Sequence, residues 1–215
     1  MRMKKFFTLV LSAAFMLNSS MLSFATTKNV SSDNNIITKQ EITEIQDYMK
    51  SHQTGLELED QTQTYNVPLS SGENAIVEIT LTKKGYSLYR DIYTAKLGKW
   101  DIDYNAKIPH KGSIKLRASF NVTHVPDMNS SNKDMVKFNV TGSSISAVPP
   151  QGASIIDKGS SYKTVYTNSE YSISGYTSFS ISGNTMNYYV DMLMYSKTNT
   201  GSERNKIYVD TNLSV

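Results

Sequence analysis

The sequence has no cysteine, so the protein has neither disulfide bonds nor a thiolate that could act as nucleophile or metal ligand. Its only histidines are His52, His110 and His124, and their spacing matches no metal-binding motif. The motifs of serine hydrolases, dinucleotide-binding folds, P-loop nucleotidases and zinc proteases are also missing. We therefore expect no metal and no cofactor, and the enzyme classes that these motifs identify are excluded.

The chain also lacks an excess of charge once its first 25 residues are set aside. The formal net charge is +3, and Arg2, Lys4 and Lys5 account for all of it. Without them, 19 basic residues remain against 19 acidic ones. Because proteins that bind nucleic acid usually present a basic surface, this balance argues against nucleic acid as a partner.

The N-terminus has the pattern of a secretory signal peptide. Basic residues precede an apolar run over Phe6–Leu17, and the tripeptide Ser-Phe-Ala at 23–25 suits a signal peptidase. The apolar run is too short for a good membrane span. We predict that residues 1–25 are removed and that a product starting at Thr26 is secreted without a stable membrane anchor. A secreted domain of this size without cysteine is typical of a Gram-positive bacterium.

One amphipathic helix is predicted near the start of the mature chain. Thr38 followed by Glu41 is the pattern of a capping box, in which each residue's side chain binds the other's backbone N–H. Ile42, Ile45 and Met49 follow at helical spacing and would form one apolar face. Such a short helix is marginal in water unless its apolar face packs against another element.

Charge divides the mature chain into two parts. Residues 26–82 contain nine acidic and three basic residues, whereas the remainder is basic. We assign 26–36 to a disordered leader, 37–72 to a helical lead-in and 73–215 to a β-domain. The charge difference favours attraction between the helix and the sheets, although the sequence leaves open whether the helix docks on its own chain.

Residues 73–215 alternate between apolar and polar side chains, with turn signals at short intervals. Tyr86–Thr94 is among the predicted strands, and Val148–Gly152 is a predicted break. Strict alternation is typical of antiparallel sheets with one wet face. The predicted fold is mainly β, an antiparallel β-sandwich of about nine strands with one N-terminal amphipathic helix.

The first predicted hairpin places Ile108 opposite Ile114, so that apolar residues face each other. This register also sets Lys107 directly opposite Lys115 on the other face, close to Arg117. Three cations on one surface suggest a binding site for an anionic wall polymer, or for the acidic stretch near the N-terminal helix.

The second predicted hairpin turns at residues 183–184 and places Ile181 opposite Met186. Its other face is rich in serine. That face also carries three tyrosines, namely Tyr176, Tyr189 and Tyr195.

Exposed tyrosines on such a face have two interpretations. Their rings could stack on sugars, which makes a glycan a candidate ligand, or they could pack beneath another layer of the protein. The only tryptophan, Trp100, falls on the apolar side of its strand, so it offers no platform for a sugar.

Acidic residues give weaker signals. Asp101 and Asp103 share one face of a strand, where paired carboxylates could support glycoside hydrolysis, but Asp103 lies close to Arg117 and an ion pair is the simpler interpretation. Residues 127–131 resemble the start of a calcium loop, but the glycine and the final glutamate of that motif are absent. No catalytic residue is predicted.

The signal peptide, the acidic helical lead-in and strands such as Gly112–Thr123 together carry a resemblance. In these features the chain resembles uncharacterised small secreted β-sandwich proteins of Gram-positive bacteria over residues 75–209. The resemblance implies a sandwich and secretion, and it implies no site residues.

These observations favour a secreted, non-enzymatic binding or structural protein at the cell envelope or host surface, with a glycan, an anionic wall polymer or a protein as partner. A first alternative is a pore-forming or membrane-damaging protein that inserts the amphipathic hairpin Tyr171–Tyr195, since each arm is long enough to cross a bilayer. A second alternative is a secreted hydrolase with carboxylates from distant positions.

Overall fold

A computed structural model describes residues 35–85, 94–126, 135–166, 170–197 and 201–215. The predicted signal peptide, most of the leader, residues 86–93 of one predicted strand and the calcium-like loop at 127–131 lie outside these ranges. The described elements are the helix α1 (Lys39–His52), the short 3-10 helices η2 (Thr94–Lys96) and η3 (Gly201–Asn205), and the strands β1 (Leu56–Glu57), β2 (Gln61–Pro68), β3 (Asn74–Lys84), β4 (Gly98–Ile108), β5 (Gly112–His124), β6 (Lys137–Val148), β7 (Ser154–Tyr166), β8 (Glu170–Ile181), β9 (Asn184–Ser196) and β10 (Lys206–Ser214).

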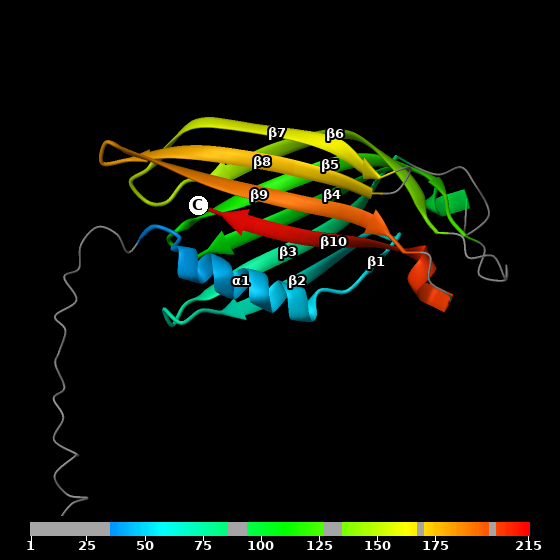
Figure 1. The fold of residues 1–215 in the computed structure, drawn as a ribbon, viewed down its shortest axis with the longest axis horizontal. Helices are drawn as coiled ribbons and strands as arrows, with labels where there is room; N and C mark the ends of the chain where they lie inside the picture. The colour runs from blue at the N-terminus through cyan, green and yellow to red at the C-terminus, as the bar shows by residue number, and fades with distance from the viewer. Residues whose placement is uncertain (1–34, 86–93, 127–134, 167–169, 198–200) are drawn as a thin grey trace, which may run out of the picture. The chain divides into compact units, whose positions relative to one another are not determined.

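These strands form two five-stranded antiparallel sheets. Sheet A has the order β1-β10-β9-β8-β7, and sheet B has the order β2-β3-β4-β5-β6. Figure 1 shows the two sheets as stacked layers, which confirms the predicted β-sandwich. The chain crosses from sheet B to sheet A through the predicted break at Val148–Gly152, where Ala153 N–H donates to the carbonyl of Pro150 (3.0 Å).

The core lies between the inner faces of the sheets, as the alternation of apolar residues requires. The side chains of Val77, Ile79 and Leu81 in β3 are completely buried, and their polar neighbours in sequence face outward. At Gly175 in β8 the sheets approach especially closely, because a Cβ there would lie 2.7 Å from Cδ1 of Ile145. Burial of apolar area between the sheets is therefore the main source of stability.

Helix α1 begins with the predicted capping box. Thr38 N–H donates to Oε2 of Glu41 (2.9 Å), and Glu41 N–H donates to Oγ1 of Thr38 (3.2 Å). Ile42, Ile45 and Met49 are buried, as predicted from their spacing. In the part of the chain that the structure describes, no helix has the length and apolar character needed to span a membrane.

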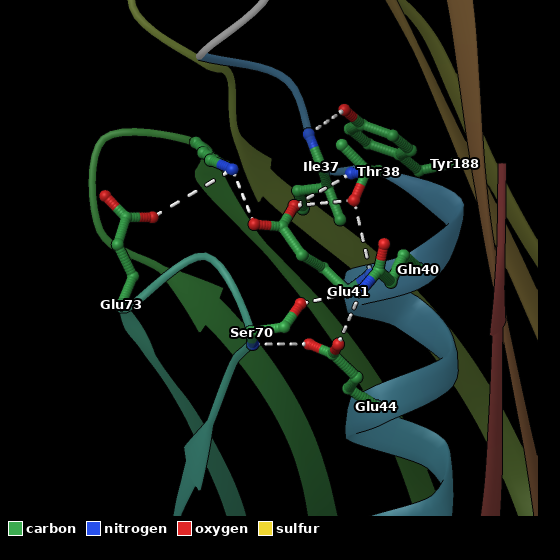
Figure 2. Close-up of polar contacts among 9 residues, drawn as sticks. Ile37, Thr38, Gln40, Glu41, Glu44, Ser70, Glu73 and Tyr188 are labelled. Atoms are coloured by element: carbon green, nitrogen blue, oxygen red, sulfur yellow. Dashed lines mark hydrogen bonds and ion pairs between the residues drawn. The ribbon is translucent and has the colours of Figure 1, made fainter. Parts of the chain in front are cut away.

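The helix docks between sheet edges of its own chain, which answers the question left open by the sequence. It contacts β10 of sheet A and β2, the end strand of sheet B (Figure 1). Figure 2 shows polar contacts at its start. Ile37 N–H donates to the hydroxyl of Tyr188 in sheet A (3.2 Å), and Ser70 N–H in sheet B's β2–β3 loop donates to Oε2 of Glu44 (3.0 Å).

A buried ion pair completes this attachment. Nζ of Lys111, in the β4–β5 loop, lies 2.6 Å from Oε1 of Glu41, and their side chains are 9% and 4% exposed. Oε2 of Glu73 lies 4.0 Å from the same ammonium group. The attraction predicted between the acidic lead-in and the basic remainder is thus present at this pair. The lead-in range 37–72 also contributes β1 and β2 to the sheets.

We expect this pair to make stability depend on pH. Burial alone raises the pKa of Glu41, but hydrogen bonds from Lys111 and Thr38 outweigh it and hold the pKa below the usual 4.5. The folded state therefore binds this proton less tightly than the unfolded state, so the stabilisation is full above pH 4.5 and is lost as pH falls through the folded pKa.

The measurement is the melting temperature of the wild type and of Glu41→Gln over a series of pH values. The difference between the two proteins should be largest near neutral pH and should shrink below about pH 4. Asp103 titrates in both proteins, so its contribution cancels. A difference that stays constant down to about pH 3 would contradict this role of Glu41.

Both predicted hairpin registers are wrong by two residues, although the faces are right. In the first, Ile108 pairs with Gly112 instead of Ile114, because His110 and Gly112 adopt positive φ angles of 63° and 93° and close a shorter loop. In the second, Ile181 pairs with Asn184 instead of Met186, around a Ser182-Gly183 turn with φ angles of 50° and 83°. A register shift of two residues leaves every side chain on the same face of the sheet, so the alternation of apolar and polar residues could not reveal it.

The structure also differs from the predicted strand Tyr86–Thr94 at the last residue of that strand. Thr94 begins the short 3-10 helix η2 instead of ending a strand. This helix leads into β4, where the indole N–H of Trp100 donates to the carbonyl of Lys96 (2.9 Å). Trp100 is 2% exposed, in agreement with its predicted inward position.

Candidate functional site

The outer face of sheet B carries the predicted basic residues, but their charges are largely balanced. Asp103 accepts hydrogen bonds from Nε and Nη2 of Arg117 (2.6 and 2.8 Å) and lies 2.7 Å from Nζ of Lys115. The neighbouring Asp101 accepts from Ser119 (2.7 Å) and pairs with Lys84 (3.3 Å). The ion pair predicted between Asp103 and Arg117 is confirmed, with the two residues directly opposed.

This arrangement keeps Asp103 ionised. Burial raises its pKa, but hydrogen bonds from Arg117 and Lys115 outweigh burial, and the net pKa lies below the usual 3.8. A carboxyl group held in this state cannot serve as a general acid near neutral pH. The paired acids on this face are therefore part of a structural ion-pair network.

The predicted opposition of Lys107 and Lys115 is wrong. With the corrected register, Lys107 lies opposite Ser113 and Lys115 lies opposite Asn105. Lys111, in the loop of the same hairpin, forms the buried ion pair with Glu41. Lys107, Lys115 and Arg117 thus share the outer face of sheet B, but the directly opposed lysine pair is not formed, and Lys115 and Arg117 are paired with Asp103.

The outer face of sheet A carries the predicted tyrosines, and here a groove is present. Tyr176 in β8 lies directly opposite Tyr189 in β9, and the two are 36% and 45% exposed. They border a shallow groove of about 450 Å³, which we call the tyrosine groove. It is lined by Gly159, Ser160, Ser161, Ser174, Gly175, Tyr176, Tyr189, Asp191 and Ser214.

The ring of Tyr176 is held over the neighbouring strand β7. A Cβ added at Gly159 would lie 2.7 Å from Cε1 of Tyr176, so only glycine leaves room for the ring. The hydroxyl of Tyr176 donates to Oδ2 of Asp157 (2.9 Å). This hydrogen bond and the charge of Asp157 raise the pKa of Tyr176, so the phenol stays protonated. The ring is thereby fixed at its edge and at its hydroxyl.

The rest of the groove is polar. Ser161, Ser174 and Ser214 come from three different strands and offer hydroxyl groups that can donate or accept hydrogen bonds. Asp191 lies opposite Ser174 in the β8–β9 pair. It is the only charged residue of the lining, and it forms no ion pair within the described ranges. The groove therefore combines two aromatic side chains with hydroxyl groups and one carboxylate.

The third predicted tyrosine is not part of this groove. Tyr195 lies further along β9, where its ring stacks on that of Tyr208 with 5.5 Å between centroids. The pattern of the hairpin therefore identifies Tyr176 and Tyr189, but it does not identify Gly159 and Ser214. Only the pairing of β7 and β10 with the hairpin brings these residues beside the tyrosines, and no local pattern reports that pairing.

Within the described ranges, no group of three or more histidine, aspartate or glutamate residues could hold a metal ion. No family model, no curated protein and no solved structure matches the chain.

Proposed function

We propose that this protein is a secreted, non-enzymatic saccharide-binding protein that acts at the cell envelope or host surface, with the tyrosine groove as its binding site. The observation that carries the proposal is the pair of exposed rings, Tyr176 and Tyr189, that borders a polar groove of about 450 Å³. The signal peptide predicted at residues 1–25 supports the location outside the cell.

The groove matches the chemistry of a sugar. A pyranose ring has apolar faces of C–H groups, which pack on aromatic rings, and a rim of hydroxyl groups, which form hydrogen bonds. Tyr176 and Tyr189 supply the aromatic surface. The serine hydroxyls can donate or accept, while the carboxylate of Asp191 can accept two hydrogen bonds from neighbouring sugar hydroxyls.

The charge of the groove selects among the candidate ligands. Because Asp191 is the only charged residue of the lining, an anionic polymer would be repelled there. A neutral saccharide or an amino sugar meets no such repulsion. We therefore assign the tyrosine groove to neutral or positively charged sugars.

The two alternatives have less support. The β8–β9 hairpin is paired with β7 on one side and β10 on the other, so its insertion into a membrane would require two ladders of hydrogen bonds to break. For a hydrolase, glycoside cleavage normally requires two carboxylates, and Asp191 alone lines the groove.

The test is calorimetric titration with cellopentaose and chitopentaose, whose β-linked pyranoses present flat C–H faces. We expect saturable binding of at least one of them by the wild type. Tyr176→Ala and Tyr189→Ala should each weaken it about tenfold or more, because each variant removes an aromatic surface from the contact.

The matched control is Tyr162→Ala, which removes another exposed tyrosine (43% exposed) from outside the groove. It should bind with the wild-type affinity. Failure of the wild type to bind any of these saccharides would contradict the proposal. So would an equal loss of affinity in the control and in the two groove variants.

A further inference from the structure

A second pocket lies where the end of α1 meets β9 and β10. It has a volume of about 380 Å³ and is separate from the tyrosine groove, with which it shares no lining residue. It is lined by Met49, Lys50, Gln53, Thr54, Tyr195, Lys197, Tyr208, Val209, Asp210 and Thr211. Among these residues, only Tyr195 is predicted from the sequence to bind a ligand, and the ligand predicted for it is a sugar.

Two cations belong to this pocket. Nζ of Lys197 lies 3.8 Å from the ring centroid of Tyr208 and 5.7 Å from that of Tyr195, so a cation–π interaction positions the ammonium group. Lys50 comes from the last turn of α1. Neither lysine belongs to an ion pair within the described ranges.

Each acidic group near these lysines has a hydrogen-bond partner of its own, although the charge of Lys197 also helps to lower the pKa of Glu203. Glu203 pairs with Lys206 (2.7 Å) and accepts a hydrogen bond from the hydroxyl of Tyr208. Asp210, the only acidic residue of the lining, accepts from the hydroxyl of Tyr195 (3.4 Å). The lining therefore holds two lysines against one carboxylate, which leaves a net positive charge.

Gln53 gives an independent indication that the pocket binds a ligand with hydrogen-bond acceptors. Its Nε2 is buried and has no hydrogen-bond partner among the described residues, although Gln53 is part of the pocket lining. A buried N–H group without an acceptor is costly and uncommon in folded proteins. Because Nε2 is not accessible to solvent as the side chain stands, an acceptor in the pocket would reach it after a rotation of the Gln53 side chain.

We propose that this pocket binds a small oxyanion, a carboxylate or a phosphate monoester carried by a ligand, with Lys50, Lys197 and Gln53 as donors. An oxyanion offers acceptors only, which matches the three donors. A cationic ligand would not fit, because the ammonium group of Lys197 already lies over the Tyr208 ring and would repel it. This pocket therefore prefers anionic ligands, whereas the tyrosine groove prefers neutral or positively charged ones.

The experiment is titration of the full secreted chain with glucuronate and with glycerol 3-phosphate, each compared with its neutral counterpart, glucose or glycerol. The two anions distinguish a sugar acid from a phosphate ester as the natural source of the charge. We expect saturable binding of at least one anion, weakened by added salt, while neither glucose nor glycerol binds at this pocket.

Charge-removing variants locate the site. Lys197→Gln and Lys50→Gln should each weaken anion binding about tenfold, because each removes a charge-assisted hydrogen bond. Lys163→Gln is the matched control, since it removes the same charge from an exposed position on β7 that is not part of the pocket. It should bind the anion with the wild-type affinity.

Gln53→Leu separates a binding role from a structural one. It removes a buried donor that has no protein partner, so the melting temperature should stay the same or rise while the affinity for the anion falls about tenfold. The proposal is overturned if neither anion binds saturably, if the Lys163 control loses as much affinity as the pocket variants, or if the pocket variants keep the wild-type affinity.

Discussion

Replacing Lys111 by methionine should lower the free energy of unfolding by about 3–5 kcal/mol, as expected when one partner of a buried ion pair is removed. The carboxylate of Glu41 would keep its burial, with a side chain only 4% exposed, and would lose the ammonium group at 2.6 Å. The nearby carboxylate of Glu73 would then add repulsion that Lys111 now screens. Urea-induced unfolding followed by circular dichroism measures the change.

The double variant Glu41→Gln/Lys111→Met is the control for this interpretation. It removes both charges, so it should recover most of the stability that the single Lys111 variant loses. The amide of the introduced glutamine can still accept from Thr38 N–H and preserve the helix cap. If the single variant loses less than about 1 kcal/mol, the pair does not hold α1 in place.

Phe138→Ala should cost about 3–5 kcal/mol of unfolding free energy, because it removes a large buried ring and leaves a cavity between the sheets. Phe138 in sheet B is completely buried. The Phe138 ring contacts the ring of Phe120, also in sheet B, in an edge-to-face arrangement with 5.6 Å between the centroids. It also contacts the ring of Tyr171 in sheet A in a tilted arrangement, again with 5.6 Å between the centroids. The residue therefore links the two layers of the sandwich.

Val148→Ala provides a matched control from the same strand. Val148 is 62% exposed, so its truncation should change the unfolding free energy by no more than about 0.5 kcal/mol. Both variants are measured by the same urea titration. A loss below about 1 kcal/mol for the Phe138 variant would contradict the packing of the two sheets through this ring.

The fold could be predicted from local patterns, because alternation and helical spacing report which side chains are buried. The inward positions of Trp100, Ile42 and Phe179 all follow from such patterns. Strand register could not be predicted to better than two residues, because it depends on the φ angles of His110 and Ser182, which a sequence pattern does not reveal.

The candidate site could be predicted only in part, for a related reason. Tyr176 and Tyr189 were identified from their own hairpin. Asp157, Gly159 and Ser214 belong to the groove or support it because β7 and β10 flank that hairpin, and this strand order is a property of the whole sheet. The ion pair between Asp103 and Arg117 could be predicted because both residues lie on one hairpin, whereas the opposition of Lys107 and Lys115 was wrong because it depended on the exact register.

The most direct measurement of the central claim is a two-dimensional NMR spectrum of the protein with isotope-labelled tyrosine rings, recorded with and without saturating saccharide from the titration panel. Tyr176 and Tyr189 should show the largest shifts, since they border the groove. The buried ring of Tyr104 and the exposed ring of Tyr162 should stay unchanged. Shifts confined to tyrosines other than Tyr176 and Tyr189, or none at all, would contradict the assignment of the tyrosine groove as a saccharide-binding site.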